Sequence, residues 1–195
     1  MSRYVSKAIH GMAFFFAALA VPQTWAAPDA VAGKAKAQLC AACHGENGVS
    51  SMPDTPHLAA QPALSIFYQL LQFRDQRRKG GGMEAIATTL TEQDMRDIAA
   101  HYATLPAPAP QTGGDAQKIA RGQQIAQQQY CSSCHGAQLQ GQKHVPRLSG
   151  QSHAYFVTQL RNLRSGARAD MDGTMASAAR SLTDEEIDAM AAYAR

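Results

Sequence analysis

One short motif occurs twice in this sequence, and the repeat constrains the fold more than any other feature. Cysteine, two intervening residues, cysteine and histidine stand at 40–44 and again at 131–135, 91 residues apart. Further matches follow both copies at offsets of 90 to 92 residues. Self-similarity at a nearly fixed period indicates two copies of one small domain rather than one larger domain.

The matching positions extend through most of each copy. A Pro-x-Leu-x-x-Gln segment occupies residues 56–61 and 146–151. A methionine also stands seven residues before a Leu-Thr pair in both copies, at Met83 and Met175. The repeat therefore covers about 80 residues on each side.

Proline and glycine concentrate between the two copies, in residues 106–114. Prolines favour an extended, stiff chain and glycines allow a turn, so this segment has the composition of a linker. We expect domain 1 over residues 27–105, the linker over 106–114 and domain 2 over 115–195.

Residues 1–26 have the features of a secretory signal peptide. Arg3 and Lys7 precede a ten-residue apolar run from Met12 to Val21, and small residues surround Ala26, which is typical of a cleaved export signal. The run has about half of the roughly 20 residues that a membrane-spanning helix needs. We therefore expect cleavage after Ala26, a periplasmic location and no membrane span in the mature chain.

The hydrophobic pattern indicates an all-α fold, because apolar residues recur at helical spacing and no alternating run indicates a sheet. Helices are expected over residues 31–39, 63–74, 119–129 and 154–164, and after N-caps at Thr91 and Thr183, the second of which is a full capping box. Aromatic residues make up only 7% of the chain. A domain of about 80 residues with so few aromatics has a marginal core on its own, and a large buried prosthetic group would complete it.

The repeated motif is typical of covalent haem attachment. Its two thiols form thioether bonds to the porphyrin, and the histidine that follows binds the iron. A zinc ribbon normally has its cysteine pairs close together, whereas Cys43 and Cys131 are 88 positions apart, and a redox-active pair explains neither the histidine nor the repeat. We expect two covalently attached haem c groups, held by Cys40, Cys43, Cys131 and Cys134, with His44 and His135 as proximal iron ligands.

Methionine and histidine are the usual sixth ligands in electron-carrying haem proteins. Met83 and Met175 are the methionines in register, 39 and 40 residues after the proximal histidines, and both are expected in loops just before a capped helix. Met95 and Met190 lie on apolar helix faces and are interpreted as packing residues. Met171 remains the alternative ligand in the second copy.

Other residues of the repeat offer secondary roles. The main-chain carbonyl of Pro56 or Pro146, 12 and 11 residues after the proximal histidines, could accept a hydrogen bond from histidine Nδ1, or the proline could simply mark a loop. Basic clusters precede both candidate methionines: Arg74, Arg77, Arg78 and Lys79 in the first copy and Arg161, Arg164 and Arg168 in the second, with Arg74 and Arg164 aligned. They could pair with haem propionates or face an acidic partner, or simply end a solvated helix.

Two further expectations concern charge and the remaining histidines. The chain carries 18 basic and 15 acidic residues, a formal charge of +3, which is too small for the cationic surface of a non-specific nucleic-acid-binding protein. Three further histidines have no partner of the same type in the other copy: His57, His144 and His153. They are interpreted as surface loop residues.

The mature chain resembles the tandem dihaem cytochromes c of the cytochrome c4 type. The resemblance rests on both haem-attachment motifs, the Pro-x-Leu-x-x-Gln segments, the Gln-Leu pairs at 69–70 and 159–160 and the methionines before Leu-Thr. It implies two small helical domains, each wrapped around one haem, with axial pairs His44 with Met83 and His135 with Met175. Domain 1 departs from the family pattern at Ala60, where Gly150 retains the usual glycine, and at Ser65, where Tyr155 supplies the usual aromatic.

The resemblance implies an electron carrier rather than an enzyme. Such a protein would move single electrons between membrane-bound respiratory donor and acceptor complexes, for example to a terminal oxidase. The main alternative is a dedicated electron-transfer subunit of a periplasmic oxidoreductase. A dihaem enzyme, such as a peroxidase or thiosulfate dehydrogenase, would need an open or unusually ligated iron, and the paired methionines argue against one.

Overall fold

The computed structural model describes residues 26–111 and 113–195, and regular structure in these ranges is helical apart from one isolated bridge between Gln142 and Val145. The expected all-α fold is confirmed. The helices of the described residues are α1 (Ala30–Lys36), α2 (Gln38–His44), α3 (Ala63–Arg74), α4 (Met83–Thr88), α5 (Glu92–Thr104), α6 (Ala116–Gln128), α7 (Cys131–His135), α8 (His153–Ser165), α9 (Thr174–Ala179) and α10 (Asp184–Tyr193). Except for Ala26, the expected signal peptide lies outside the described residues. Across the two described ranges, no helix is both long and apolar enough to cross a membrane.

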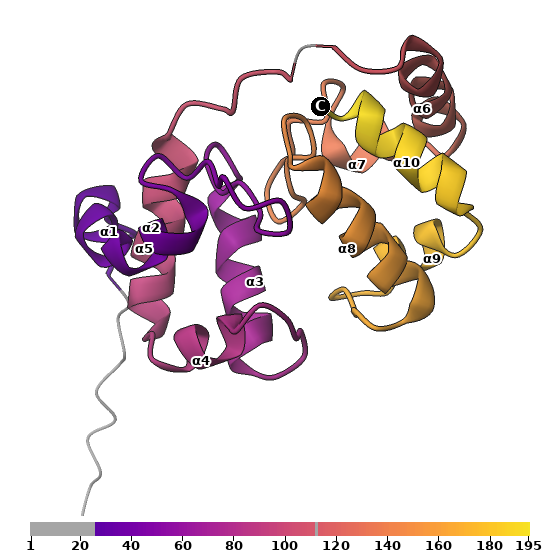
Figure 1. Ribbon diagram of the computed structural model, residues 1–195. Helices are drawn as coiled ribbons and strands as arrows, with labels where there is room; N and C mark the ends of the chain where they lie inside the picture. Colours follow the sequence, from indigo (N-terminus) through magenta and orange to yellow (C-terminus); the bar gives the residue numbers. More distant parts are fainter. Residues whose placement is uncertain (1–25, 112) are drawn as a thin grey trace, which may run out of the picture.

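The helices form two bundles of the same design, α1–α5 and α6–α10, joined by an extended connection (Figure 1). In each bundle the first helix crosses the last, α1 against α5 and α6 against α10. A glycine stands at each crossing. A Cβ atom would lie 1.9 Å from the Asp97 carbonyl oxygen at Gly33 and 2.1 Å from that of Ala189 at Gly122, so only glycine allows the helices to approach this closely.

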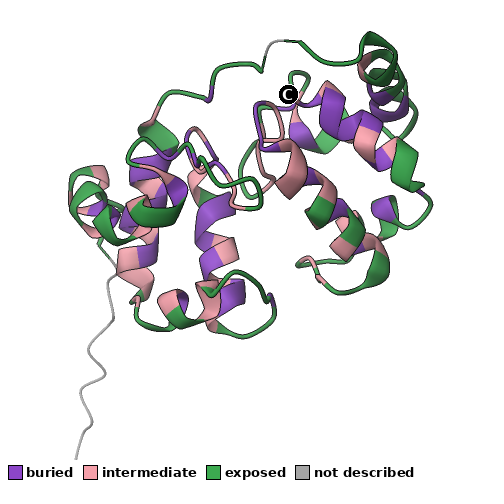
Figure 2. Cartoon of the chain, in the orientation of Figure 1, coloured by how far each residue is buried: buried purple, intermediate pink, exposed green. Residues whose placement is uncertain are grey.

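Each bundle has its own apolar core, and the two cores are separate clusters. Met95, Ile98 and Tyr102 on α5 and Ile187 on α10 are at most 2% exposed, so the helix faces expected from the sequence are the buried ones. Figure 2 shows the buried positions inside the bundles and mainly exposed positions along the connection.

Capping fixes where the last helix of each bundle begins. Thr183 and Glu186 form the expected capping box, and Thr91 forms a second complete box with Asp94, whose side chain accepts from the Thr91 N–H. From the sequence, the motif at Thr91 was expected to be an N-cap without a complete capping box. The box is complete because aspartate, although shorter than glutamate, still reaches back to the N-cap nitrogen, at 3.0 Å.

Four short helices differ from the sequence expectation. The haem-attachment motifs follow the helices α1 and α6, as expected, but themselves lie in short helices that were not expected, α2 and α7. The methionines expected in loops instead stand in the first turn of α4 and α9. These helices have at most seven residues, which is too short for hydrophobic periodicity to register.

Candidate haem sites

The two proximal histidines have the same local geometry. His44 is the last residue of α2 and His135 the last of α7. Their Nδ1 atoms lie 2.9 Å from the carbonyl oxygen of Pro56 and 2.8 Å from that of Pro146. Because a carbonyl only accepts, Nδ1 is the donor and Nε2 carries the free lone pair. The expected role of the proline carbonyls is confirmed.

The surroundings of these imidazoles fit metal ligation. His44 and His135 are 6% and 3% exposed, and burial lowers the pKa of both, although the bonds to the proline carbonyls oppose the shift. Both rings are therefore neutral at physiological pH, the form that binds iron. The Nε2 atom of His135 is buried without a hydrogen-bond partner, an arrangement that costs free energy unless the nitrogen binds something. The residues present thus fit a haem iron.

The cysteines are placed for attachment rather than for a disulfide. All four are free thiols, and each pair is spaced i, i+3 on a helix, so both thiols lie on one side. Cys40 and Cys131 pack against the cores of their domains, whereas Cys43 and Cys134 are exposed. Burial raises the pKa of Cys40 and of Cys131, so neither is a reactive thiolate of the redox type.

An apolar pocket in the second bundle brings the attachment motif and the candidate sixth ligand together. Its lining includes Cys131, Met175 and Met190, with apolar residues of α8 and α9. Met175 packs partly buried against the core, whereas Met171 is 59% exposed. This placement supports Met175 over Met171 as the ligand.

Met83 has the corresponding place in the first bundle. It packs partly buried against the core, as Cys40 does. Met95 is fully buried, which supports its interpretation as a packing residue. Gly82 and Gly173, with φ of +76° and +77°, turn the chain into the helices that present Met83 and Met175. A left-handed backbone conformation at this position favours glycine.

The aligned arginines Arg74 and Arg164 pair with carboxylates of their own domains. Arg74 pairs with Glu92 and its neighbour Asp75, and Arg164 pairs with Asp184. They bind the N-terminal turn of the next long helix, where acidic residues cluster, so their charge is already neutralised. A haem-directed role for this pair is not supported.

Two other arginines, Arg78 and Arg168, meet across the domain boundary. Arg78 donates to Tyr155 at 2.7 Å and to Gln159 at 3.1 Å, while Arg168 donates to Gln159 at 2.8 Å and to Gln69 at 3.1 Å. Burial, followed by the charge of Arg78, lowers the pKa of Arg168 to about 10, and its Nε atom is buried without a partner. Two clustered, largely buried cations favour an anion beside them.

Both residues belong to the basic clusters recognised in the sequence, but Arg74 and Arg164 were singled out there as the aligned pair. Arg78 and Arg168 stand at the same 90-residue offset as the rest of the repeat. That register could have revealed them, but the neighbouring cations Arg77 and Lys79 hid the match within a general basic cluster.

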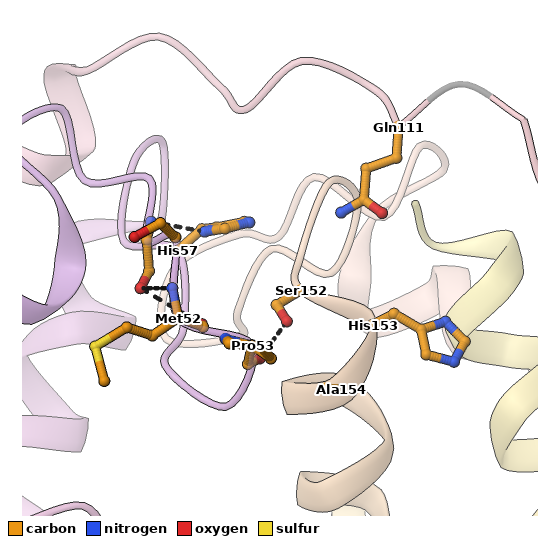
Figure 3. Close-up of a pocket in the computed structure, with 9 residues that line it drawn as sticks. Met52, Pro53, His57, Gln111, Ser152, His153 and Ala154 are labelled. Carbon is orange, nitrogen blue, oxygen red and sulfur yellow. Dashed lines mark hydrogen bonds between the residues drawn. The ribbon is translucent and has the colours of Figure 1, made fainter.

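A cleft at the domain boundary contains histidines but none of the proposed iron ligands. Figure 3 shows Ser152 pointing to the Pro53 carbonyl, to which it donates, while His153 points away from the cleft. The ring of His153 bonds to Asp188 at 2.9 Å. His57 is 8% exposed, and its Nδ1 accepts from the Ser50 N–H. The expectation that His57 is a surface residue is therefore wrong, because the other domain covers its loop.

Comparisons with known proteins agree with this geometry. The family model described as cytochrome c matches residues 119–195, and the model described as cytochrome c oxidase, cbb3-type, subunit III matches residues 26–101. Cytochrome c4 of Thiocapsa roseopersicina is 40% identical, over 85% of this chain and 91% of that protein. A protein described as thiosulfate dehydrogenase electron acceptor, from Thiomonas intermedia, is 31% identical over 99% of this chain and 90% of its own length.

A solved structure has the same arrangement over almost its whole length. Reduced recombinant cytochrome c4 from Pseudomonas stutzeri superimposes with a TM-score of 0.80 at 29% sequence identity, covering 86% of this chain and 98% of that one. The similarity therefore includes both bundles.

Proposed function

Because this chain belongs to the cytochrome c4 family, as its identity with the Thiocapsa protein over nearly the full length shows, we propose that it carries single electrons between a membrane-bound respiratory donor and an acceptor such as a terminal oxidase. The fold of two cytochrome c domains, the two covalently bound haem c groups and the role in electron transfer follow from the family. The ligands, domain bounds and location are inferred from this chain's own residues, and the partners from its resemblance to the family.

The proposed iron ligands are His44 with Met83 in domain 1 and His135 with Met175 in domain 2. When bound, each haem supplies an iron that gains and loses one electron. The histidine Nε2 would hold the iron, and the carbonyl bond at Nδ1 fixes the ring and raises its basicity. The thioether sulfur of the methionine would be the second protein ligand and would favour the ferrous state.

We assign haem attachment to the two cysteine pairs and retain 27–105 and 115–195 as the domain bounds. Arg78 and Arg168 are proposed to face the haem propionates, the anions that their buried charges require. We further propose that residues 1–26 are removed on export and that the mature protein works in the periplasm.

The single observation that carries the carrier assignment is the symmetric placement of ligands. In both bundles a buried, neutral histidine and a partly buried methionine are available. A histidine and a methionine that both held the iron would leave it no site for a substrate, so these residues support electron transfer without enzymatic turnover.

A dedicated electron-transfer subunit is the second candidate, favoured by the similarity to the thiosulfate dehydrogenase electron acceptor of Thiomonas intermedia. The two functions differ in the donor. A free carrier is reduced rapidly by membranes that contain its respiratory donor, whereas a dedicated subunit is reduced rapidly only by its own soluble dehydrogenase.

The assignment is tested by peptide mass mapping and by electron transfer with membranes. We expect the mature protein to begin at Ala27 and the peptides containing residues 40–44 and 131–135 each to carry one haem. The reduced protein should then be oxidised by oxidase-containing membranes. A peptide without haem would refute that attachment site, and reduction of the oxidised protein only by a soluble dehydrogenase partner, not by membranes that contain the respiratory donor, would favour the subunit function.

A further inference from the structure

Two buried glutamine side chains bind main chain across the domain boundary. Gln151 of domain 2 accepts from the N–H of His57 at 2.8 Å and donates to the carbonyl of the same residue at 3.0 Å. Gln61 of domain 1 makes the same pair of bonds with Arg147, at 3.0 and 2.9 Å. Because each pair of residues is related by the 90-residue repeat, the four bonds form an interface with approximate two-fold symmetry.

The bond from Gln151 ends on the peptide group that also holds a proximal histidine. Pro56 and His57 are consecutive, so the Pro56 carbonyl and the His57 N–H belong to one planar peptide unit. His44 Nδ1 donates to the oxygen of this unit at 2.9 Å. Gln151 Oε1 accepts from its nitrogen. One peptide group thus separates the histidine of domain 1 from a side chain of domain 2.

An equivalent series of hydrogen bonds links the proximal histidine of domain 2 to a side chain of domain 1. His135 Nδ1 donates to the carbonyl of Pro146 at 2.8 Å, and the Arg147 N–H of that peptide unit donates to Gln61 Oε1. The backbone itself dictates the amide orientation. An N–H only donates and a carbonyl only accepts, so the amide oxygen faces the N–H and the amide nitrogen faces the carbonyl.

Hydrogen bonds in series polarise one another. Donation from the peptide N–H to glutamine makes the carbonyl of the same peptide a stronger acceptor. A stronger acceptor at Nδ1 makes the imidazole a more basic ligand, which stabilises ferric iron. The effect on the reduction potential therefore has a definite sign, downwards.

We propose that Gln61 and Gln151 are positioning residues that lower the reduction potential of the haem in the opposite domain, acting through one shared peptide unit. Gln151 acts on the haem ligated by His44, and Gln61 acts on the haem ligated by His135. This inference rests on the proposed axial role of the two histidines. It adds that each domain helps to set the potential of the other.

A purely structural role for the glutamines has a different signature. If they only held the domains together, losing one would loosen the whole interface and admit water to both haem sites. Greater solvent exposure stabilises the charged ferric form, so both potentials would fall. Loss of the relay, the series of hydrogen bonds from a glutamine through the shared peptide unit to a proximal histidine, instead raises one potential, that of the haem in the other domain.

The test uses the full-length holoprotein with Gln151→Leu and, separately, Gln61→Leu. The potential of each haem is followed by NMR during a redox titration, after Met83→His has identified the domain 1 signals. Gln151→Leu should raise the ferrous-to-ferric ratio of the domain 1 haem by about two- to fivefold at fixed applied potential, equivalent to about 20 to 40 mV, and leave the domain 2 haem unchanged. Gln61→Leu should produce the mirror result. If either leucine variant does not fold, Gln→Met at the same position replaces it.

Ser152→Ala is the matched control, since it removes an interdomain bond, to Pro53, that is not part of either relay. The Ser152→Ala variant should raise neither haem potential. The His44 Nδ1–H resonance should move upfield in Gln151→Leu but not in the control, because its hydrogen bond weakens. The relay would be overturned if a glutamine variant shifted the potential of the haem in its own domain or shifted both potentials equally. A lowered potential, or no change in either potential, would overturn it as well. If the wild-type protein does not have the spectrum of histidine–methionine ligation, the proposed ligands themselves are refuted.

Discussion

Rising urea concentration should detach Met83 from iron before Met175, because the segment that presents Met83 is less constrained. Three consecutive glycines precede Met83, with φ of +133°, +67° and +76°, and the only side-chain bond to the main chain of that segment joins Glu84 to the Gly80 N–H at 2.8 Å. In domain 2, Asp170 accepts from the Met175 N–H at 2.6 Å and Asp172 accepts from the Thr174 N–H at 3.0 Å.

These differences set the expected magnitude. The two additional glycines of domain 1 cost about 0.5 to 1 kcal/mol each in conformational entropy on ordering. The additional side-chain bond in domain 2 contributes about 0.5 to 1.5 kcal/mol. Together they favour the closed segment of domain 2 by about 2.5 kcal/mol, which is roughly a seventyfold smaller opening constant.

The methyl resonances of the two ligand methionines in the reduced protein report each bond separately during the titration. Asp170→Ala should bring the release of Met175 close to that of Met83, while Glu84→Ala in domain 1 should move only Met83, to still lower urea. Loss of the Met175 signal first, or an Asp170→Ala variant with unchanged order, would refute the reasoning.

The remaining predictions concern backbone strain, pH and ligand identity. Ala60 is held at φ +55° where its counterpart Gly150 has +75°, so Ala60→Gly should stabilise domain 1 by about 0.5 to 1 kcal/mol and Gly150→Ala should destabilise domain 2 by at least as much, measured by urea unfolding. The hydrogen bond from Lys36 lowers the pKa of Asp94 to about 2. The resulting stabilisation of domain 1, about 1 to 2 kcal/mol after allowance for partial exposure, is present above pH 4 and lost as the pH falls towards 2, and Lys36→Met should flatten this acid dependence. Met83→His should lower the potential of one haem only and abolish about half of the methionine-to-iron charge-transfer absorption of the oxidised protein; if both haems respond, the assignment of Met83 is wrong.

Local sequence signals predicted the long helices and the bond that orients each proximal histidine. The helix at 63–74 was predicted correctly to the residue, because its apolar spacing extends over three turns. The carbonyls of Pro56 and Pro146 were identified because the repeat places a proline at almost the same distance from each histidine. Such features depend on neighbouring residues, which a sequence displays directly.

Contacts between distant residues were not predictable in the same way. Gln61 and Gln151 were recognised as a repeated pair, yet their partners lie 86 and 94 residues away in the other domain. His57 was misjudged for the same reason, since nothing in its own loop indicates that a second domain covers it. The left-handed turns before α4 and α9 likewise became visible only in the backbone geometry.

The central claim is that both irons carry electrons with no site left open. A potentiometric titration of the mature protein with and without carbon monoxide tests it most directly, because carbon monoxide binds an open ferrous haem and raises its potential. We predict that two electrons enter each chain in one-electron steps and that the two curves coincide. Uptake of fewer than two electrons, or a step moved to higher potential under carbon monoxide, would contradict the claim.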